Sequence, residues 1–357
     1  MPEQFRTPKW SGPSPGELYA ARDAEQKKEK SDIFHNASFL AILMLIYNFL
    51  NRVNARLFWI GTYMVFSGKI TLDAAAAQAY LLEQKKELIS STTFKMTGSV
   101  LIVVVSSIGI FLIGQFIMKI RLTDILKPYR GFALDGAKFF PAALSLNLLS
   151  GVIVTVIVSR LGEQGITVPG SDFSMHSPTK YELLIQFVYV CLIGPICEEF
   201  IYRGLVIKLL SPYGKGIAVV FSALTFGLMH ANIEQAVPAV MGGLVYALVA
   251  VRYNSIAPTI IIHILNNICA SVSDYGDALG WSNTDLINRI IDITTLFLGF
   301  YGIIVLFTAL IAEVHESEPK CSLSKEKRFG AVFTNIFVII YLVYLFWELI
   351  EKIIQAN

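Results

Sequence analysis

Two adjacent glutamates and an arginine stand inside an apolar stretch of this chain, in the sequence GPICEEFIYRGLV at residues 194–206. Glu199 and Arg203 are four residues apart with the acid first, which is the favourable order for an ion pair on a helix. Glu198 points about 100° away from Glu199 on the same helix, where it has no obvious partner. A carboxyl group without a partner in a dry pocket can serve as a general acid or base. The spacing therefore predicts a structural ion pair beside a chemically active Glu198.

Two histidines and an asparagine in later apolar segments add groups of the same kind. The sequence FGLMH ends at His230, and HILNN runs from His263 to Asn267, in a chain with only five histidines. His263 and Asn267 are four residues apart, so both can donate to one acceptor between helices. Preorganised donors of this kind suit an oxyanion. An acid, two imidazoles and an amide could therefore form one site.

Each group also has an ordinary structural explanation. The three charged residues of the first motif could lie at the interfacial end of a helix and reach out of the lipid. His230, followed by Asn232 and Glu234, could belong to a solvated turn. His263 and Asn267 could simply bridge two membrane helices. Their joint occurrence at similar depth favours a functional site.

The composition indicates a polytopic membrane protein. The chain has 357 residues, of which 54% are hydrophobic and 16% charged, and its mean hydropathy is +0.59. A soluble globule could not bury so much apolar surface in one core. The net charge of +2 does not indicate a nucleic-acid partner. The four cysteines form neither a disulfide framework nor a metal-binding cluster in their spacing.

Nine apolar segments approach the length of about 20 residues that a membrane-spanning helix needs. The sequence therefore predicts an all-α, polytopic helical bundle of about nine spans, with the functional groups on the fourth, fifth and seventh. The predicted spans are 34–50, 97–120, 137–161, 182–209, 216–233, 236–252, 256–273, 288–314 and 329–351. The predicted divisions are a polar cytosolic tail (1–33), a first span with an amphipathic or re-entrant segment (34–96), a core (97–314), and a basic loop with an extra C-terminal span (315–357).

Lysine and arginine in the loops predict a cytosolic N-terminus, since cytoplasmic loops of membrane proteins are enriched in both. The basic residues between Arg52 and Lys95 conflict with this orientation, because they would lie in the first outward loop. At 1.5 Å per residue from the inner surface, Glu198 lies about 15 Å deep, His230 about 22 Å and His263 about 16 Å. We therefore expect an intramembrane site nearer the cytosolic face.

Pro195 follows Gly194 one turn before the glutamates. Proline removes a backbone hydrogen bond, so we expect a kink there through which water or an extended peptide could enter.

These residues resemble the signatures of a known family. EEFIYR, FGLMH and HILNN are similar to the E-E-x-x-x-R, F-x-x-x-H and H-x-x-x-N motifs of the CAAX-protease and bacteriocin-processing family, also called Abi, which includes the Ras-converting enzyme. The three motifs occur in the order and on the spans that the family's eight-helix core implies. The resemblance covers roughly residues 97–310.

The resemblance implies an intramembrane glutamate-dependent endopeptidase with neither a catalytic metal nor another cofactor. Glu198 and His230 would activate a water molecule, His263 and Asn267 would stabilise the oxyanion, and Glu199 with Arg203 would support the site. The substrate would be a peptide or protein, such as a prenylated C-terminal tail or a leader segment, met at the cytosolic side of a cell membrane.

Other functions stay open at this point. A catalytically idle relative could act as a membrane scaffold or bacteriocin immunity protein. Glu198, His230 and His263 could instead bind a catalytic zinc ion, for which a carboxylate and two imidazoles are a plausible ligand set. Intramembrane Glu and His also occur in proton-coupled transporters. Nothing in the sequence indicates the oligomeric state.

Overall fold

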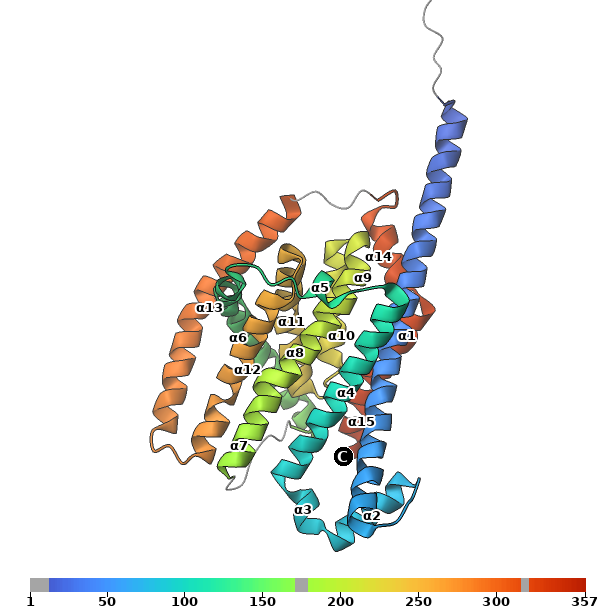
Figure 1. Cartoon of the computed structure of the whole chain (residues 1–357). Coiled ribbons are helices and arrows are strands. Elements are labelled where there is room, and N and C mark those ends of the chain that lie inside the picture. Colours follow the sequence, from blue (N-terminus) through green and yellow to red (C-terminus); the bar gives the residue numbers. More distant parts are fainter. Residues whose placement is uncertain (1–12, 171–178, 316–320) are drawn as a thin grey trace, which may run out of the picture.

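The computed structural model describes residues 13–170, 179–315 and 321–357, and every regular element in these segments is a helix. Helices are the expected solution for long apolar segments, because every backbone polar group in lipid must be satisfied within the protein. The helices pack side by side as a bundle (Figure 1). In chain order they are α1 (Pro15–Ser67), α2 (Ala74–Gln84), α3 (Lys86–Ser90), α4 (Thr92–Met118), α5 (Leu122–Ile125), α6 (Phe132–Glu163), α7 (Lys180–Phe187), the π-helix η1 (Val188–Ile193), α8 (Gly194–Glu198), the π-helix η2 (Glu199–Val206), α9 (Ile207–Leu210), the 3-10 helix η3 (Ser211–Tyr213), α10 (Lys215–Leu228), α11 (Ile233–Tyr253), α12 (Ala257–Ala278), α13 (Thr284–His315), α14 (Lys325–Phe333) and α15 (Ile336–Gln355).

The predicted all-α membrane bundle is confirmed. Six described helices are long and apolar enough to cross a membrane, or seven if α14 and α15, which meet at a 60° bend, form one span. Two of the nine predicted segments, 216–233 and 256–273, correspond to the shorter apolar helices Lys215–Leu228 and Ala257–Val272. Each of the nine apolar segments is thus largely helical, although fewer than nine helices pass on length and hydropathy.

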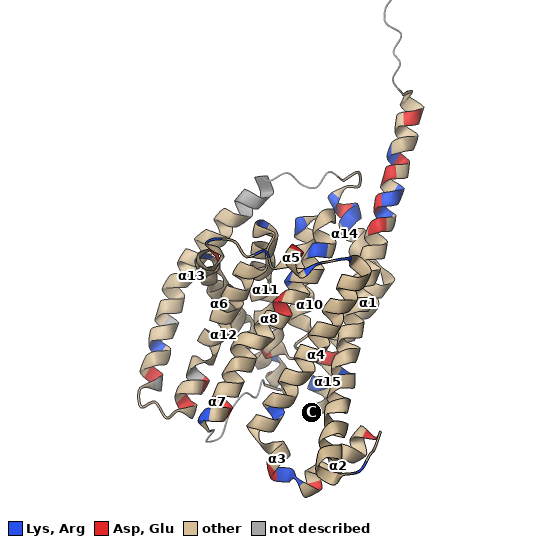
Figure 2. Ribbon diagram, viewed as in Figure 1, with Lys and Arg blue, Asp and Glu red and all other residues tan. Residues whose placement is uncertain are grey.

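Helix α1 is much longer than the sequence pattern predicted. The expected break after residue 50 is absent, and α1 continues through 53 residues from Pro15 to the left-handed Gly68 (φ 68°). Its start is set by a capping box, in which Ser14 and Glu17 bond each other's backbone N–H groups. At 1.5 Å per residue it is about 80 Å long, against about 30 Å for a hydrocarbon core. Its charged first part therefore projects from the bundle (Figure 2).

The predicted kink at Pro195 takes a different form. The stretch Lys180–Tyr213 runs on as one helical span, and Pro195 lies in its short α8 part between two π-helical segments. The Gly194 N–H bonds the carbonyl of Tyr189, five residues back. A wider turn accommodates the proline, which has no N–H to donate.

The first and last helices belong to the same hydrophobic core as the motif-bearing helices. Leu43 of α1, Tyr202 of η2, Val245 of α11 and Tyr341 of α15 are all buried in one cluster. Close contact at the centre depends on Gly243. A Cβ there would lie 3.0 Å from Arg203 Nη2 and 3.1 Å from the Phe226 ring.

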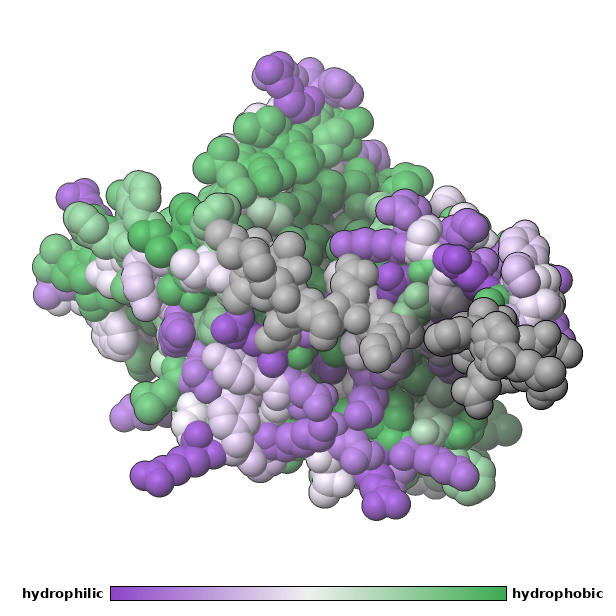
Figure 3. All heavy atoms as spheres, turned by 90° about the horizontal axis from the view of Figure 1, so that it is seen from above, coloured by the Kyte–Doolittle hydropathy of each residue, from purple (hydrophilic) through white to green (hydrophobic). Residues whose placement is uncertain are grey.

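The distribution of lysine and arginine along the bundle bears on its orientation in the membrane. α14, with Lys325, Lys327 and Arg328, lies at the same end as the start of α1, and basic residues mark this end in Figure 2. Seen from above, hydrophilic side chains gather over part of this end, and hydrophobic side chains dominate elsewhere (Figure 3). Arg52, one of the conflicting basic residues, does not lie in a loop. It pairs with Glu348 of α15 in a contact between two helices.

We predict from this arrangement that the end carrying the start of α1 and α14 is cytosolic. In single-cysteine variants made without the four native cysteines, a membrane-impermeant maleimide should label Leu72→Cys and Leu279→Cys in intact cells, since both side chains are exposed at the opposite end. Lys325→Cys should be labelled only after permeabilisation. Labelling of Lys325→Cys in intact cells would reverse the orientation.

Candidate active site

Glu199, Arg203 and His263 form a buried group between η2 and α12. Arg203 Nη1 lies 3.1 Å from Glu199 Oε1 in the predicted i,i+4 pair, and both side chains are fully buried. His263 Nδ1 lies 2.9 Å from the same oxygen. Because Arg203 keeps Glu199 ionised, the carboxylate accepts and Nδ1 of His263 donates. This bond sets the orientation of the His263 ring and leaves its Nε2 facing the other way.

Glu198 lies on the open side of that ring. Its Oε2 is 3.6 Å from His263 Nε2, and its side chain is 19% exposed, in contrast to the fully buried Glu199. The two adjacent glutamates therefore occupy different environments, as the sequence predicted. Glu198 has a partner on another helix, which spacing within one helix could not reveal.

Two aromatic rings hold these groups in place. Phe226 of α10 meets the His263 ring edge-on with centroids 5.5 Å apart, and Tyr246 of α11 stacks on His263 at 5.0 Å. The Arg203 guanidinium lies 4.1 Å from the Phe226 centroid and 5.1 Å from that of Tyr246. Such cation–π contacts help to offset the loss of hydration of a buried arginine.

His230 lies in the turn after α10, and it also faces the site. Its Nδ1 is 3.0 Å from the carbonyl of Phe226 and 3.3 Å from that of Gly227. Carbonyl oxygens only accept, so Nδ1 carries a proton, and Nε2 is the nitrogen with a lone pair whenever the ring is neutral. The turn is completed by Ala231 in a left-handed conformation (φ 51°) and by Asn232, which caps α11. His230 therefore lies both in a turn and on the wall of the candidate site.

Asn267 lies one helical turn from His263 on α12. Its Nδ2 donates to the carbonyl of Val190 at 2.9 Å, within the π-helical η1. The neighbouring Asn266 accepts a hydrogen bond from Asn147 of α6. The predicted pair of donors thus shares a helix face, and one Asn267 hydrogen is engaged with backbone.

One cavity of about 880 Å³ brings the predicted groups together. Glu198, His230, His263 and Asn267 all line it, whereas Glu199 and Arg203 lie behind its wall. The cavity runs in one direction from Glu198, which is the last lining residue of its span, while His263 is the first on α12. Asp274 and Glu234 line the other end.

If the start of α1 is cytosolic, as predicted, the direction of the cavity differs from the expected access near the cytosolic face. The lining residues beyond the glutamates lie toward the end of the bundle opposite the start of α1, where α7 begins and α12 ends (Figure 1). Helical rise gives the distance of Glu198 from one membrane surface. It does not indicate on which side of Glu198 the helices separate.

Several lining residues were not identified from the sequence. Tyr47 and Asn51 of α1, Asn147 of α6 and Tyr246 of α11 all contribute to the wall. Asn51 and Asn147 are polar residues in apolar surroundings, and that signal was available for both. Tyr47 and Tyr246 gave none, because tyrosine is common in membrane spans.

The donor geometry does not favour a zinc site. Over residues 13–170, 179–315 and 321–357, no three His, Cys, Asp or Glu side chains are grouped closely enough to hold a metal ion. His230 instead has its Nδ1 on two carbonyls.

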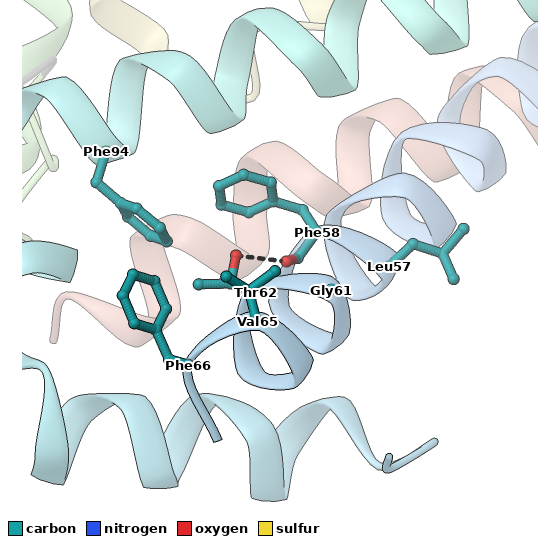
Figure 4. Close-up of a pocket in the computed structure, with 7 residues that line it drawn as sticks. All are labelled: Leu57, Phe58, Gly61, Thr62, Val65, Phe66 and Phe94. Carbon is teal, nitrogen blue, oxygen red and sulfur yellow. Dashed lines mark hydrogen bonds between the residues drawn. The ribbon is translucent and has the colours of Figure 1, made fainter. Parts of the chain in front are cut away.

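A second pocket lies near the end of α1, and its lining is almost entirely apolar. It is lined by apolar and aromatic side chains with one hydroxyl, that of Thr62, which donates to the carbonyl of Phe58 at 2.8 Å (Figure 4). Because no ionisable side chain lines it, it is not a candidate for the chemistry.

Comparison with protein families finds a match at the residues of this site. The family model described as type II CAAX prenyl endopeptidase Rce1-like matches residues 180–269. That segment contains all three motifs, including the four cavity residues Glu198, His230, His263 and Asn267.

A curated relative points the same way. The membrane-embedded CAAX protease MroQ of Staphylococcus aureus (strain USA300) is 29% identical over 132 residues, which are 34% of this chain and 52% of the relative. The match thus spans about half the length of that protein. No solved structure matches significantly. Together with the three motifs and their convergence on one cavity, these matches support the assignment of the chain to the CAAX-protease and bacteriocin-processing family.

Proposed function

We propose that this protein is an intramembrane endopeptidase that hydrolyses a peptide bond without a metal ion. The observation that carries the proposal is the placement of Glu198, His230 and His263 on the wall of one cavity, with His263 Nε2 3.6 Å from Glu198. The family supports a protease, since both the matching family model and the relative are described as CAAX proteases.

In the proposed reaction, Glu198 and His230 activate the attacking water. An ionised Glu198 accepts one proton of the water, while Nε2 of His230, which keeps a lone pair, orients the molecule or takes the proton on. The water oxygen forms a bond to the scissile carbonyl carbon. The proton then passes to the leaving amine as the C–N bond breaks, so Glu198 returns to its starting state.

His263 and Asn267 are the proposed donors to the oxyanion. His263 donates through Nδ1 to Glu199, so only its cationic form can also donate through Nε2. Glu198 lies 3.6 Å from this Nε2. The second Asn267 hydrogen would complete the pair. Removal of one such donor typically lowers kcat by about 100- to 1,000-fold.

We propose a peptide or protein segment as substrate, in a multi-pass protein of the cell membrane with a cytosolic N-terminus. Amides and hydroxyls along the wall, such as Asn147, Gln235 and Ser271, suit the polar groups of an extended backbone. With the proposed topology, the direction of the cavity favours substrate entry at the outer end of the bundle rather than at the cytosolic face.

Metal removal tests the proposed mechanism. Purified protein treated with a chelator such as 1,10-phenanthroline should retain its full rate of peptide cleavage, because no step requires a Lewis acid. The rate is measured by mass spectrometry of products from a library of short synthetic peptides. Loss of activity on chelation, restored by zinc alone, would favour the zinc protease instead.

A further inference from the structure

Two asparagine side chains on the cavity wall are bonded to each other and take no part in the proposed chemistry. Asn147 of α6 donates through Nδ2 to Oδ1 of Asn266 on α12, and both half-buried residues line the cavity. In the part of the chain that the structure describes, these two side chains form no other hydrogen bond. Asn147 lies outside the segment that the family model matches, and Asn266 stands at a variable position of the H-x-x-x-N motif. The pair therefore has no assigned role.

The bond between the two amides leaves complementary groups unused. A carboxamide has an oxygen that accepts and an NH2 group that donates. Asn147 therefore keeps its Oδ1 as an acceptor, and Asn266 keeps its Nδ2 as a donor. If both amides were turned over, one acceptor and one donor would still be left. Gly242 of α11 has no side chain to cover the Asn147 oxygen, since a Cβ there would lie 3.7 Å from it.

Contacts with three other elements fix this part of α12. His263 bonds Glu199 of η2 at 2.9 Å, and Asn267 donates to a backbone carbonyl of η1 at 2.9 Å. The bond from Asn147 ties Asn266 to α6. A ligand that reaches the pair therefore meets amides that are already oriented, which lowers the entropic cost of binding.

The pair lies close to the reacting groups along the cavity. Asn266 follows His263 by three residues, which is about 4.5 Å along the helix, toward the lining residues of the open end. An extended peptide rises about 3.3 Å per residue. With its scissile bond at Glu198, such a peptide reaches the pair one or two residues away. In an extended strand the N–H and C=O of one residue point to the same side, so one residue can bond both amides.

We propose that Asn147 and Asn266 bind the backbone N–H and C=O of one substrate residue, one or two positions from the cleaved bond on the side that leads out of the cavity. This inference rests on the proposed peptidase function, because it takes Glu198 as the position of the scissile bond. Both asparagines are positioning residues, which hold the strand and transfer no proton. Since every peptide carries these backbone groups, the pair fixes the strand without selecting its side chains.

Replacing single backbone amides of a peptide by esters removes one N–H at a time. Full-length Glu198→Gln protein in detergent is incubated with a library of fluorescent synthetic decapeptides, and retained peptides are remade with an ester at each position in turn. One ester should weaken binding, measured by anisotropy, by about fivefold, as expected for one neutral hydrogen bond. Adding Asn147→Leu should abolish the effect of that ester, because the acceptor of the N–H is then gone. Adding Asn266→Leu should weaken binding of the parent peptide.

A matched control is an asparagine that joins two helices outside the cavity. Asn54 of α1 donates to Ser106 Oγ of α4 at 2.8 Å and does not line the cavity. Asn54→Leu, added to Glu198→Gln, should leave the ester effect unchanged. Thermal unfolding is recorded for each variant, and Asn147→Ser, whose hydroxyl is too short to reach the strand, replaces Asn147→Leu if the leucine variant does not fold.

Any of three results overturns the proposal: no peptide is retained, no ester weakens binding, or the ester effect persists with the Asn147 variant. Cleavage of the same peptides by wild-type protein, measured in parallel, reports separately on the peptidase. If an ester effect depends on Asn147 and no peptide is cleaved, the amide pair binds peptides and the peptidase proposal fails. If peptides are cleaved and no ester effect depends on Asn147, the peptidase stands and the pair does not position the strand.

Discussion

Replacing Glu198 by glutamine is expected to lower kcat for peptide cleavage by at least about a hundredfold, which is the lower end of the contribution of a general acid or base. Glutamine keeps the size and one oxygen of the side chain but cannot take up the proton of the water. Because Glu198 is 19% exposed and lies 3.6 Å from His263, longer than a hydrogen bond, the change should leave the fold intact. The measurement is product formation by purified protein, with thermal unfolding recorded on the same samples.

The neighbouring glutamate provides the matched comparison. Glu199→Gln removes the carboxylate that bonds both Arg203 and His263, so we expect it to lower thermal stability as well as activity. Glu163→Gln, at an exposed ion pair with Arg160, should change neither. If Glu198→Gln retains the wild-type rate, Glu198 is not the catalytic acid or base.

Replacing Arg203 by methionine is expected to lower the free energy of unfolding by about 3–5 kcal/mol, the range found when one partner of a buried ion pair is removed. Glu199 would stay fully buried without its arginine partner. The loss also includes the cation–π contacts of the guanidinium with Phe226 and Tyr246. Unfolding in mixed micelles, followed by tryptophan fluorescence, measures the change.

The control for this prediction is a second arginine–glutamate pair. Arg160→Met breaks the pair with Glu163, whose side chains are 74% and 63% exposed, and should cost no more than about 1 kcal/mol. The double variant Glu199→Gln with Arg203→Met should recover part of the loss, since it leaves no uncompensated charge. Equal effects of Arg203→Met and Arg160→Met would contradict a buried supporting role for Arg203.

The sequence was most informative where the interactions are local. The Glu199–Arg203 pair follows from a spacing of four residues on one helix, and the structure bears it out at 3.1 Å. The bond between His263 and Glu199 joins residues 64 positions apart, and no helical periodicity predicts it. The residues of the motifs were therefore found, but not the pairing that orients them.

The largest error concerned the first helix, for a physical reason. A hydropathy window detects only the part of a helix that matches lipid, whereas α1 continues from Pro15 to Ser67 because its polar ends also satisfy their backbone hydrogen bonds internally. The direction of the cavity was likewise beyond the sequence, because it depends on where the packed helices separate. Tyr47 of α1 reaches the site from outside the matched region for the same reason.

The most direct test of the central proposal, a peptidase that depends on Glu198, compares peptide termini. Membranes and medium from cells that produce either wild-type or Glu198→Gln protein at equal levels are examined by mass spectrometry for newly formed N- and C-termini. The proposal predicts one or more termini that are present with wild-type protein and lost with Glu198→Gln. Identical sets of termini in the two samples, from equally abundant and folded proteins, would contradict it.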